Sequence, residues 1–555
     1  MNEISNDVLF DGLLGHGLFA KKIPNFLSSE LFLHYFKEAY IKPEKLLDIS
    51  PSPKGYIRYN NMRNNSTPRP LAIPEPFAYA LLSYTLKENW QKLQIHFNTM
   101  TLNNSHKISR IHVRNKKAQK AIFEMNYKNF DLDGNPVDDI IIGKRYQVNA
   151  DISKCFPSIY SHATSWALEG KSNAKNNINK KEEWYNKIDF STRNIKYGET
   201  NGLLIGPHAS NLLSEIILTR VDKELSDQKF QYIRNIDDYT CYVSSYGEAE
   251  KFLLTLSKEL SKYELSLNHK KSEIKKLPTE SEASWANQLR RYINHEISYF
   301  FTKKIIEKKH ISIKKINTIE IKMFLDFVVS LTKKNNQNVS IINYAIKTLS
   351  NKELSHNAQI YLLKKIHHLV LLYPYLCSIL EKHLFDAHKV DPSYIIPIAK
   401  DLYKEGINNN NYEACSYSIY WSLKYGIQFD NGYIDPSKNN NTSAFSYYFK
   451  EDAIKSEDCI FLLLAFLYDK RHKIPDRPSY QKEYRQCANH LKKNDFDKYW
   501  LFIYEVLSAD SLPFLYKKMK NEKISFVEEQ FNTTPHAHNK PHAMPTIPPS
   551  NADET

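Results

Sequence analysis

Residues 232–243 read YIRNIDDYTCYV, with two adjacent aspartates between two apolar runs. Aromatic and β-branched residues lie on both sides of Asp237 and Asp238, which is typical of a β-hairpin with two carboxylates at its tip. Two adjacent carboxylates held between apolar strands repel each other unless a cation lies near them. An Asp-Asp pair also has an ordinary explanation, because aspartate side chains hydrogen-bond to the backbone of turns.

A third carboxylate stands at the end of a second apolar run. Residues 146–159 read YQVNADISKCFPSI, and Asp151 follows Val148 and Ala150 in a segment that predicts a buried strand. An unpaired carboxylate at such a place is costly. One carboxylate from a strand end and two from a hairpin tip are what a pair of divalent cations needs for in-line phosphoryl transfer. The three aspartates together therefore indicate a metal-dependent phosphoryl-transfer site.

The two acidic segments belong to a series of five blocks. In chain order the blocks read RPLAIPEP at 69–76, ADISKCFPSIYSH at 150–162, NGLLIGPHASNLLSEIILTRVD at 201–222, NIDDY at 235–239 and LSLNHKKSEI at 265–274. They resemble reverse transcriptases, and among these the prokaryotic abortive-infection, defence-associated branch, which is AbiK-like. The resemblance implies an α+β fingers–palm fold of the right-hand polymerase type, followed by an all-α domain of HEAT-like helical repeats. Asn235 departs from the family pattern, which usually has an aromatic residue before x-Asp-Asp.

The resemblance also assigns the metal site and a proton donor. It implies two bound Mg²⁺ ions, with Mn²⁺ as the alternative, and the expected ligands are Asp151, Ile152 through its carbonyl, Asp237 and Asp238. Lys271 stands in the place of a lysine that protonates the leaving pyrophosphate. The adjacent Lys270 fits the spacing as well, so the choice between the two stays open.

Four further residues are expected to bind the nucleotide. Arg69 would contact the triphosphate through its fixed fork of donors, unless it is an ordinary surface arginine. Phe156 would be the steric gate beneath the sugar, which predicts a preference for deoxynucleotides; the alternative is a core phenylalanine. The small pair Asn201 and Gly202 would bring the backbone against the nucleotide and the template base, at the start of a predicted helix.

Charge favours a polyanionic partner. The chain carries 76 Lys and Arg against 62 Asp and Glu, a net charge of +14. Such a balance suits nucleic acid, although a Lys- and Asn-rich composition also follows from genome bias. A basic segment is expected to contact template or product, with a solvated surface as the alternative; its expected contact residues are Arg110, Arg114, Lys116 and Lys117.

A length of 555 residues predicts several domains. We expect an N-terminal helical segment at 1–55, fingers and palm at 56–300, helical repeats at 301–530 and a disordered tail at 531–555. Six scattered cysteines without C-x-x-C spacing, and the lack of an export signal, favour the cytoplasm. The longest apolar run, residues 459–468, is about half the length of a membrane span and predicts a buried helix.

The expected function is that of an antiviral, anti-phage defence reverse transcriptase. It would be a Mg²⁺-dependent DNA polymerase that adds dNTPs to a growing DNA strand, with a non-coding RNA as template or with none, and with a nucleic-acid or a protein primer. One alternative is a catalytically silent polymerase fold that binds RNA and acts as a scaffold through its helical half. Another is a structural role in which that half assembles a homo-oligomer. No membrane partner is expected.

Overall fold

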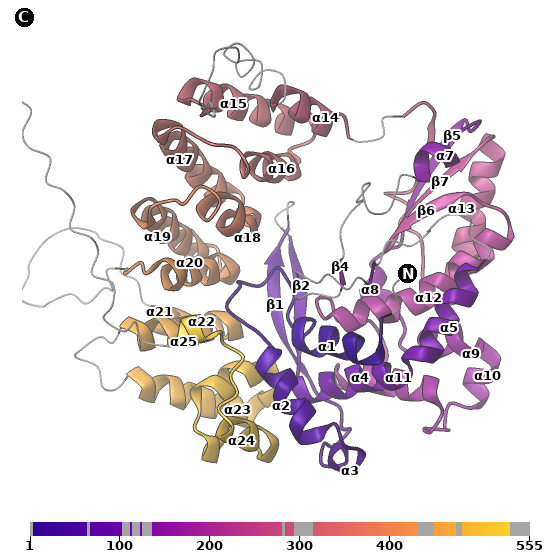
Figure 1. The fold of residues 1–555 in the computed structure, drawn as a ribbon, viewed down its shortest axis with the longest axis horizontal. Coiled ribbons are helices and arrows are strands. Elements are labelled where there is room, and N and C mark those ends of the chain that lie inside the picture. Colours follow the sequence, from indigo (N-terminus) through magenta and orange to yellow (C-terminus); the bar gives the residue numbers. More distant parts are fainter. Residues whose placement is uncertain are drawn as a thin grey trace, which may run out of the picture.

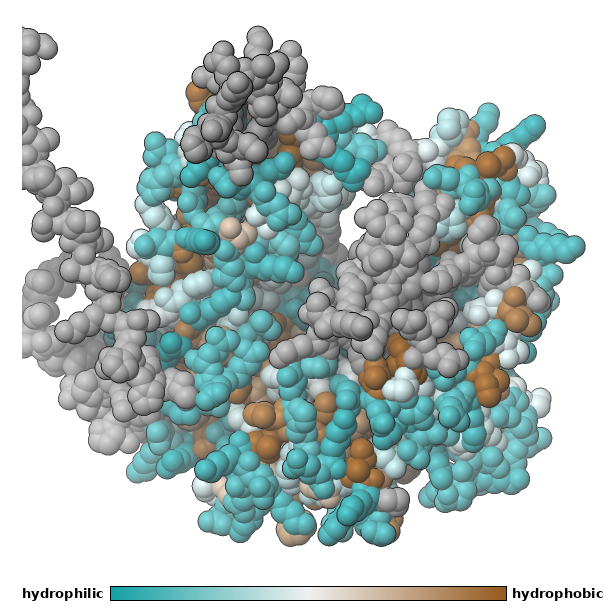
Figure 2. All heavy atoms as spheres, viewed as in Figure 1, coloured by the Kyte–Doolittle hydropathy of each residue, from teal (hydrophilic) through white to brown (hydrophobic). Residues whose placement is uncertain are grey.

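The computed structural model describes residues 4–63, 67–102, 136–279, 283–293, 315–429, 449–472 and 480–532, and two short strands at 112–113 and 123–124. Figure 1 shows the described residues as a curved assembly, with the C-terminal helices on one side, the palm on the other and a β-hairpin between them. Among the coloured residues in Figure 2, hydrophilic ones make up most of the visible surface.

The palm is built on an antiparallel sheet of four strands in the order β6-β7-β5-β8. The strands are β5 (Tyr146–Asp151), β6 (Tyr232–Asn235), β7 (Asp238–Val243) and β8 (Glu273–Lys276). The predicted strand that ends at Asp151 and the predicted hairpin with aspartates at its tip are both confirmed, because Ile236 and Asp237 alone join β6 to β7. The β-branched and aromatic residues of these strands account for their formation.

Helices cover the palm sheet. The long α12 (His208–Asp227) and α13 (Tyr246–Ser261) pack against each other, and α13 contacts β5 and β7. Shorter helices complete this part: α7 (Pro136–Ile140), α8 (Cys155–Ser158), α9 (His162–Glu169), α10 (Lys171–Asn176) and α11 (Trp184–Asn194).

The prediction that a helix begins at Asn201 and Gly202 is wrong. The helix α12 begins at His208, directly after Pro207. Gly202 and Gly206 have positive φ angles of 86° and 127°, which a right-handed helix does not contain. Proline in turn is suited to a helix start, because its fixed φ fits there and its missing N–H is not needed.

The N-terminal segment contains helices α1 (Asn6–His16), α2 (Glu30–Tyr40) and α3 (Pro43–Leu46). An antiparallel hairpin follows, formed by β1 (Tyr56–Met62) and β2 (Pro68–Pro74). The chain then continues through α4 (Pro76–Glu88) and α5 (Trp90–Thr101), and the short strands β3 (His112–Val113) and β4 (Phe123–Glu124) pair with each other. Helix α1 packs on α4, and α5 packs on α12, so the fingers and palm share one hydrophobic core.

The described residues from 284 to 532 are almost entirely helical, and we call them the helical half. Its elements are α14 (Ser284–Arg291), α15 (Thr318–Lys334), α16 (Ser340–Leu349), α17 (His356–Leu372), η3 (Pro374–Leu376), α18 (Cys377–Leu380), η4 (Glu381–Phe385), α19 (Pro392–Asn408), α20 (Tyr412–Tyr425), α21 (Phe449–Ser456), α22 (Cys459–His472), α23 (Tyr480–Val506), η5 (Ala509–Ser511), α24 (Phe514–Asn521) and α25 (Glu529–Asn532). The major helices pack in sequence, α15 on α17, α17 on α19, α19 on α20, α20 on α22 and α22 on α23. A HEAT-like repeat stays a prediction.

The apolar run at 459–468 lies in α22, where all of its residues are buried, so the predicted buried helix is confirmed. Helix α22 is apolar on every side because other helices and β1 surround it. Within the ranges that the structure describes, none of the helices has the length and apolar character needed to cross a membrane.

The helical half also packs against the fingers. Strand β1 contacts α20, α22 and α23, and the Asp497 carboxylate accepts a hydrogen bond from the Gly55 backbone N–H at 2.8 Å. The Tyr516 hydroxyl donates to the buried Glu75 at 2.7 Å. A single hydrophobic core therefore runs from the N-terminal helices to α25.

Candidate active site

The register of the palm sheet brings the three predicted aspartates together. Asp151 ends β5 and lies directly opposite Asp238, the first residue of β7. The backbone N–H of Ile152 donates to the carbonyl of Asp237 at 3.2 Å, so the hairpin tip is tied to the end of β5. Asp151 is buried at 6% exposure, Asp237 is half-buried and Asp238 is exposed. The expected cluster exists, and its role as a metal site stays a prediction.

Burial and mutual repulsion disfavour the charged forms of the carboxylates at the hairpin tip. Burial raises the pKa of Asp237, and the negative charge of Asp151 adds to the rise. Although Asp238 is exposed as a whole residue, partial removal of its carboxylate from water raises its pKa to about 6, and the charge of Asp237 and a hydrogen bond with Asp151 add to the rise. The positive charge of Lys271 opposes both shifts. Such a cluster is stabilised by any cation that binds near it.

Lys271, and not Lys270, pairs with the cluster. The Lys271 ammonium lies 2.6 Å from Oδ2 of Asp151, and this hydrogen bond raises the pKa of the lysine. Asn268 holds the same aspartate by donating from Nδ2 to Oδ1 at 3.1 Å and from its backbone N–H to the Asp151 carbonyl at 2.7 Å. Asn268 is not among the residues predicted from the sequence, although it lies in the same block as Lys271.

The four predicted nucleotide residues lie on three segments: β2, α8 and the loop that precedes α12. Arg69 is exposed on β2, where its positive charge lowers the pKa of Asp237. Phe156 is half-buried in α8, and its carbonyl accepts a hydrogen bond from the Leu203 N–H at 2.7 Å. Asn201 is exposed and pairs with Tyr160 in an isolated β-bridge.

Gly202 is held against the segment that carries Phe156. Its N–H donates to the Ile159 carbonyl at 2.8 Å, and its φ is 86°. A Cβ at this position would lie 2.9 Å from the carbonyl oxygen of Pro157. Glycine is therefore required both by the conformation and by the close approach of the backbone.

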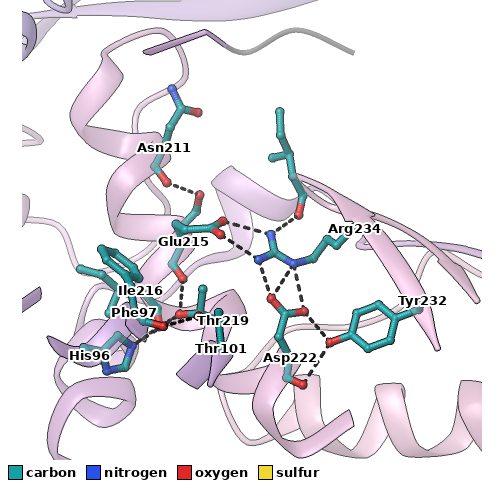
Figure 3. A network of polar contacts seen from close by, with 12 residues as sticks. His96, Phe97, Thr101, Asn211, Glu215, Ile216, Thr219, Asp222, Tyr232 and Arg234 are labelled. Atoms are coloured by element: carbon teal, nitrogen blue, oxygen red, sulfur yellow. Dashed lines mark hydrogen bonds and ion pairs between the residues drawn. The ribbon is translucent and has the colours of Figure 1, made fainter. Parts of the chain in front are cut away.

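A buried ionic network, shown in Figure 3, lies beneath the hairpin tip. Arg234 of β6 is fully buried and pairs with Glu215 and Asp222, both on α12. Tyr232 donates its hydroxyl proton to Asp222 at 2.9 Å. The sequence reasoning missed this network. A signal for it existed, since an arginine interrupts the apolar strand and two acids interrupt the apolar stripe of the helix.

The structure does not test the predicted nucleic-acid contacts of the basic segment. Arg110, Arg114, Lys116 and Lys117 lie outside the described residues. Within the described ranges, no group of three or more His, Cys, Asp or Glu side chains is arranged to hold a metal ion, and Lys271 supplies the positive charge at Asp151. The donor set still suits a hard divalent cation, because Mg²⁺ and Mn²⁺ prefer carboxylate oxygens and a neighbouring cation would relieve the raised pKa of Asp238.

Comparison with known families identifies the domain. Residues 65–300 match the family described as reverse transcriptase (RNA-dependent DNA polymerase). The chain contains a reverse transcriptase domain. The matched residues include all five sequence blocks and the four palm strands, and the domain is that of an RNA-directed DNA polymerase. Domains of this family generally use divalent metal ions.

Several solved telomerase structures are similar to this chain. They include apo telomerase from Candida tropicalis truncated from its C-terminal domain, with 14% identity and a TM-score of 0.28 over 46% of this chain and 55% of that one. The apo telomerase of the same organism has 11% identity and a TM-score of 0.29 over 72% and 68%. Its complex with a fragment of telomeric RNA has 11% identity and a TM-score of 0.28 over 69% and 65%. The chain thus spans about half the length of the first of these. No curated protein matches the chain.

Proposed function

We propose that the whole chain is a Mg²⁺-dependent DNA polymerase of the reverse transcriptase type, acting in cytoplasmic defence against phage. The observation that supports catalysis is the pairing of Asp151 with Asp238 across the sheet, next to Asp237 at the hairpin tip. The defence role is supported by the resemblance of the five blocks to the abortive-infection branch, and by the helical half that follows the palm.

In this proposal Asp151, Asp237 and Asp238, with the Ile152 carbonyl, would hold two Mg²⁺ ions, with Mn²⁺ as a substitute. When bound, such ions activate the attacking hydroxyl and neutralise the triphosphate. Lys271 holds a proton beside Asp151 and gives it to the departing pyrophosphate. Asn268 keeps the Asp151 carboxylate fixed while this proton moves.

The nucleotide would be held by residues from both sides of the cluster. Arg69 binds the triphosphate with its guanidinium fork. Phe156 packs beneath the sugar and excludes a 2′-hydroxyl, while Gly202 lets the backbone approach the base closely. The basic segment with Arg110, Arg114, Lys116 and Lys117 would bind phosphates of the nucleic acid without reading its sequence.

Two features of the reaction follow from the same resemblance. The DNA strand would grow either on a non-coding RNA template or without one, and from either a nucleic-acid primer or a hydroxyl of the protein. Incubation of the purified full chain with each single dNTP, before and after nuclease treatment, separates templated from untemplated synthesis. Proteinase treatment of the product separates the two kinds of primer, because a protein-primed strand changes its gel mobility when the protein is digested.

The test of catalysis compares Asp237→Asn with a matched surface variant, Asp510→Asn, which changes an exposed aspartate far along the chain. We expect Mg²⁺-dependent dNTP incorporation by the wild type and by Asp510→Asn. The Asp237→Asn variant should lose about 1,000-fold in rate, equal to about 4 kcal/mol of transition-state stabilisation. Its thermal unfolding should still be cooperative. Equal synthesis by all three proteins would refute the proposal.

The defence role is tested in cells challenged with phage. Cells that express the wild-type chain should give fewer plaques than cells that express Asp237→Asn at the same level. Co-purified RNA without any DNA synthesis would instead support the silent, RNA-binding scaffold. Analytical ultracentrifugation of the full chain tests the proposed homo-oligomer, which would be assembled through the helical half.

A further inference from the structure

The turn that carries Asp237 has an unusual backbone. Ile236 and Asp237 are the two residues between β6 and β7, and Ile236 has a φ of 57°. A β-branched residue rarely adopts this left-handed conformation, which is strained and persists only where the surroundings fix it. Whatever fixes the Ile236 backbone also fixes the peptide group that leads into Asp237.

Arg234 is the group that holds this backbone. Its Nη1 donates to the carbonyl of Ile236 at 2.9 Å, and this carbonyl belongs to the peptide group that joins Ile236 to Asp237. The same nitrogen donates to Oε2 of Glu215 at 3.0 Å. The bond therefore ties the catalytic turn to a carboxylate on α12.

All donors of the buried guanidinium are used. Nη2 donates to Oε1 of Glu215 at 2.9 Å and to Oδ2 of Asp222 at 2.6 Å, and Nε donates to Asp222 at 3.0–3.1 Å. Two carboxylates and one carbonyl thus accept from the five N–H groups of Arg234. A planar fork with every donor paired cannot rotate without breaking a hydrogen bond, so its orientation is fixed.

The two carboxylates stand on a rigid support. Helix α12 is buried along most of its length and packs against α5, α9 and α13. A series of hydrogen bonds then runs from α12 through Glu215 and Asp222 to Arg234, and from Arg234 to the Ile236 carbonyl. A buried ion network is weak evidence for stability, because apolar residues of similar volume often serve the fold equally well. A role in placing the turn explains the network better.

We propose that Arg234 is a positioning residue that sets the direction of the Asp237 carboxylate by holding the Ile236 carbonyl, with Glu215 and Asp222 as its anchors. Arg234 touches neither nucleotide nor metal in this role, and it acts through the turn. The inference rests on the proposed function, in which Asp237 is a metal ligand.

The test uses Arg234→Lys and a control from the same network, Tyr232→Phe. Lysine keeps the positive charge but lacks the fork, so it cannot serve both anchors and the Ile236 carbonyl at once. The control removes the hydroxyl that donates to Asp222 and leaves every hydrogen bond of Arg234 in place. Both variants disturb a buried network, and only the first releases the turn.

Three quantities are measured: the unfolding temperature without metal, the binding of Mn²⁺ by electron paramagnetic resonance, and kcat and KM for dNTP. For Arg234→Lys we expect Mn²⁺ affinity and kcat to fall about 10–100-fold, as for groups that orient metal ligands, with KM within about threefold. Tyr232→Phe should lower the unfolding temperature and leave Mn²⁺ affinity and kcat unchanged. The Mn²⁺ signal that is present in the wild type and lost in Asp237→Asn is assigned to this site.

Wild-type Mn²⁺ affinity in Arg234→Lys would overturn the inference, and so would equal losses of affinity in Arg234→Lys and Tyr232→Phe. If Arg234→Lys fails to fold, Glu215→Gln takes its place, because Asp222 still neutralises the arginine there and only one anchor is weakened. A smaller fall of Mn²⁺ affinity is then expected, and unchanged affinity refutes the inference. The wild type could make no DNA while Arg234→Lys still binds Mn²⁺ more weakly than the wild type does. This result would refute the proposed function and leave the inference about Arg234 standing.

Discussion

Asp151 and Asp238 face each other across β5 and β7, so one strand register sets the separation of two of the three clustered carboxylates. The third, Asp237, is fixed by the hydrogen bond between its carbonyl and the Ile152 N–H. Because side chains alternate between the two faces of a strand, a shift of one residue would turn Asp151 away from the hairpin tip. The apolar core beneath β5 opposes such a shift, because Val148 and Ala150 would then lose their buried places.

Lys271→Met should reduce polymerase activity far more than Lys270→Met. Both lysines are exposed and have the same size and charge, but the Lys271 ammonium lies 2.6 Å from Asp151, whereas Lys270 has no ion pair among the described residues. Loss of a general acid lowers kcat by about 100-fold or more, and KM for dNTP should change little. Steady-state kinetics of both variants check this. A stronger effect of Lys270→Met would assign the proton donor to that residue.

Phe156→Ala should relax the choice between deoxy- and ribonucleotides. The ring is half-buried on α8 beside the segment that holds Gly202, and its removal opens the space that a 2′-hydroxyl would need. We expect the ratio of kcat/KM for dNTP to that for rNTP to fall about 10–100-fold. Phe230→Ala is the control, because it truncates another half-buried palm phenylalanine, one that packs on Phe252. An equal change of the ratio in both variants would show that Phe156 acts only in packing.

Gly202→Ala should damage the candidate active site, whereas Gly247→Ala should not. The new Cβ at 202 would meet the Pro157 carbonyl at 2.9 Å in a left-handed backbone conformation. Gly247 has open space around it in helix α13, where alanine stabilises by about 0.5–1 kcal/mol. The measurements are polymerase activity and the unfolding temperature. Wild-type activity and stability in Gly202→Ala would contradict the close approach of these two segments.

The sequence predicted what depends on local pattern. Apolar, β-prone runs predicted β5 and the β6–β7 hairpin, and an uninterrupted apolar run predicted α22. The start of α12 was predicted wrongly. Gly202 and Gly206 have positive φ angles, which a right-handed helix does not contain, so the helix begins only after Pro207. The local pattern marks Arg234, Glu215 and Asp222 as charged residues within apolar segments, but it could not show that they pair with one another. Such pairs depend on tertiary packing, which residue spacing does not encode.

Glu413 offers a test of the packing between the helical half and the fingers. This buried glutamate of α20 accepts hydrogen bonds from the Asn61 Nδ2 at 2.6 Å and from the Met62 N–H, at the end of strand β1. Burial raises the pKa of Glu413 to about 7, although both hydrogen bonds and the charge of Lys22 oppose the rise. The native protein therefore keeps a proton here at pH values where the unfolded chain has lost it.

Glu413→Gln should flatten the dependence of stability on pH. Because the pKa is higher in the native state than in the unfolded chain, this glutamate supports folding fully below pH 4.5, and the support is lost as the pH rises through about 7. Glutamine carries no proton to lose, and its amide can donate to Oδ1 of Asn61, which is buried and lacks a partner among the described residues. The free energy of unfolding of the variant should equal that of the wild type near pH 5 and exceed it at pH 8 by on the order of 2 kcal/mol. Unfolding temperatures of both proteins at the two pH values check this, and Glu250→Gln, at an exposed position, is the control. If wild type and Glu413→Gln differ by the same amount at both pH values, Glu413 is charged at both.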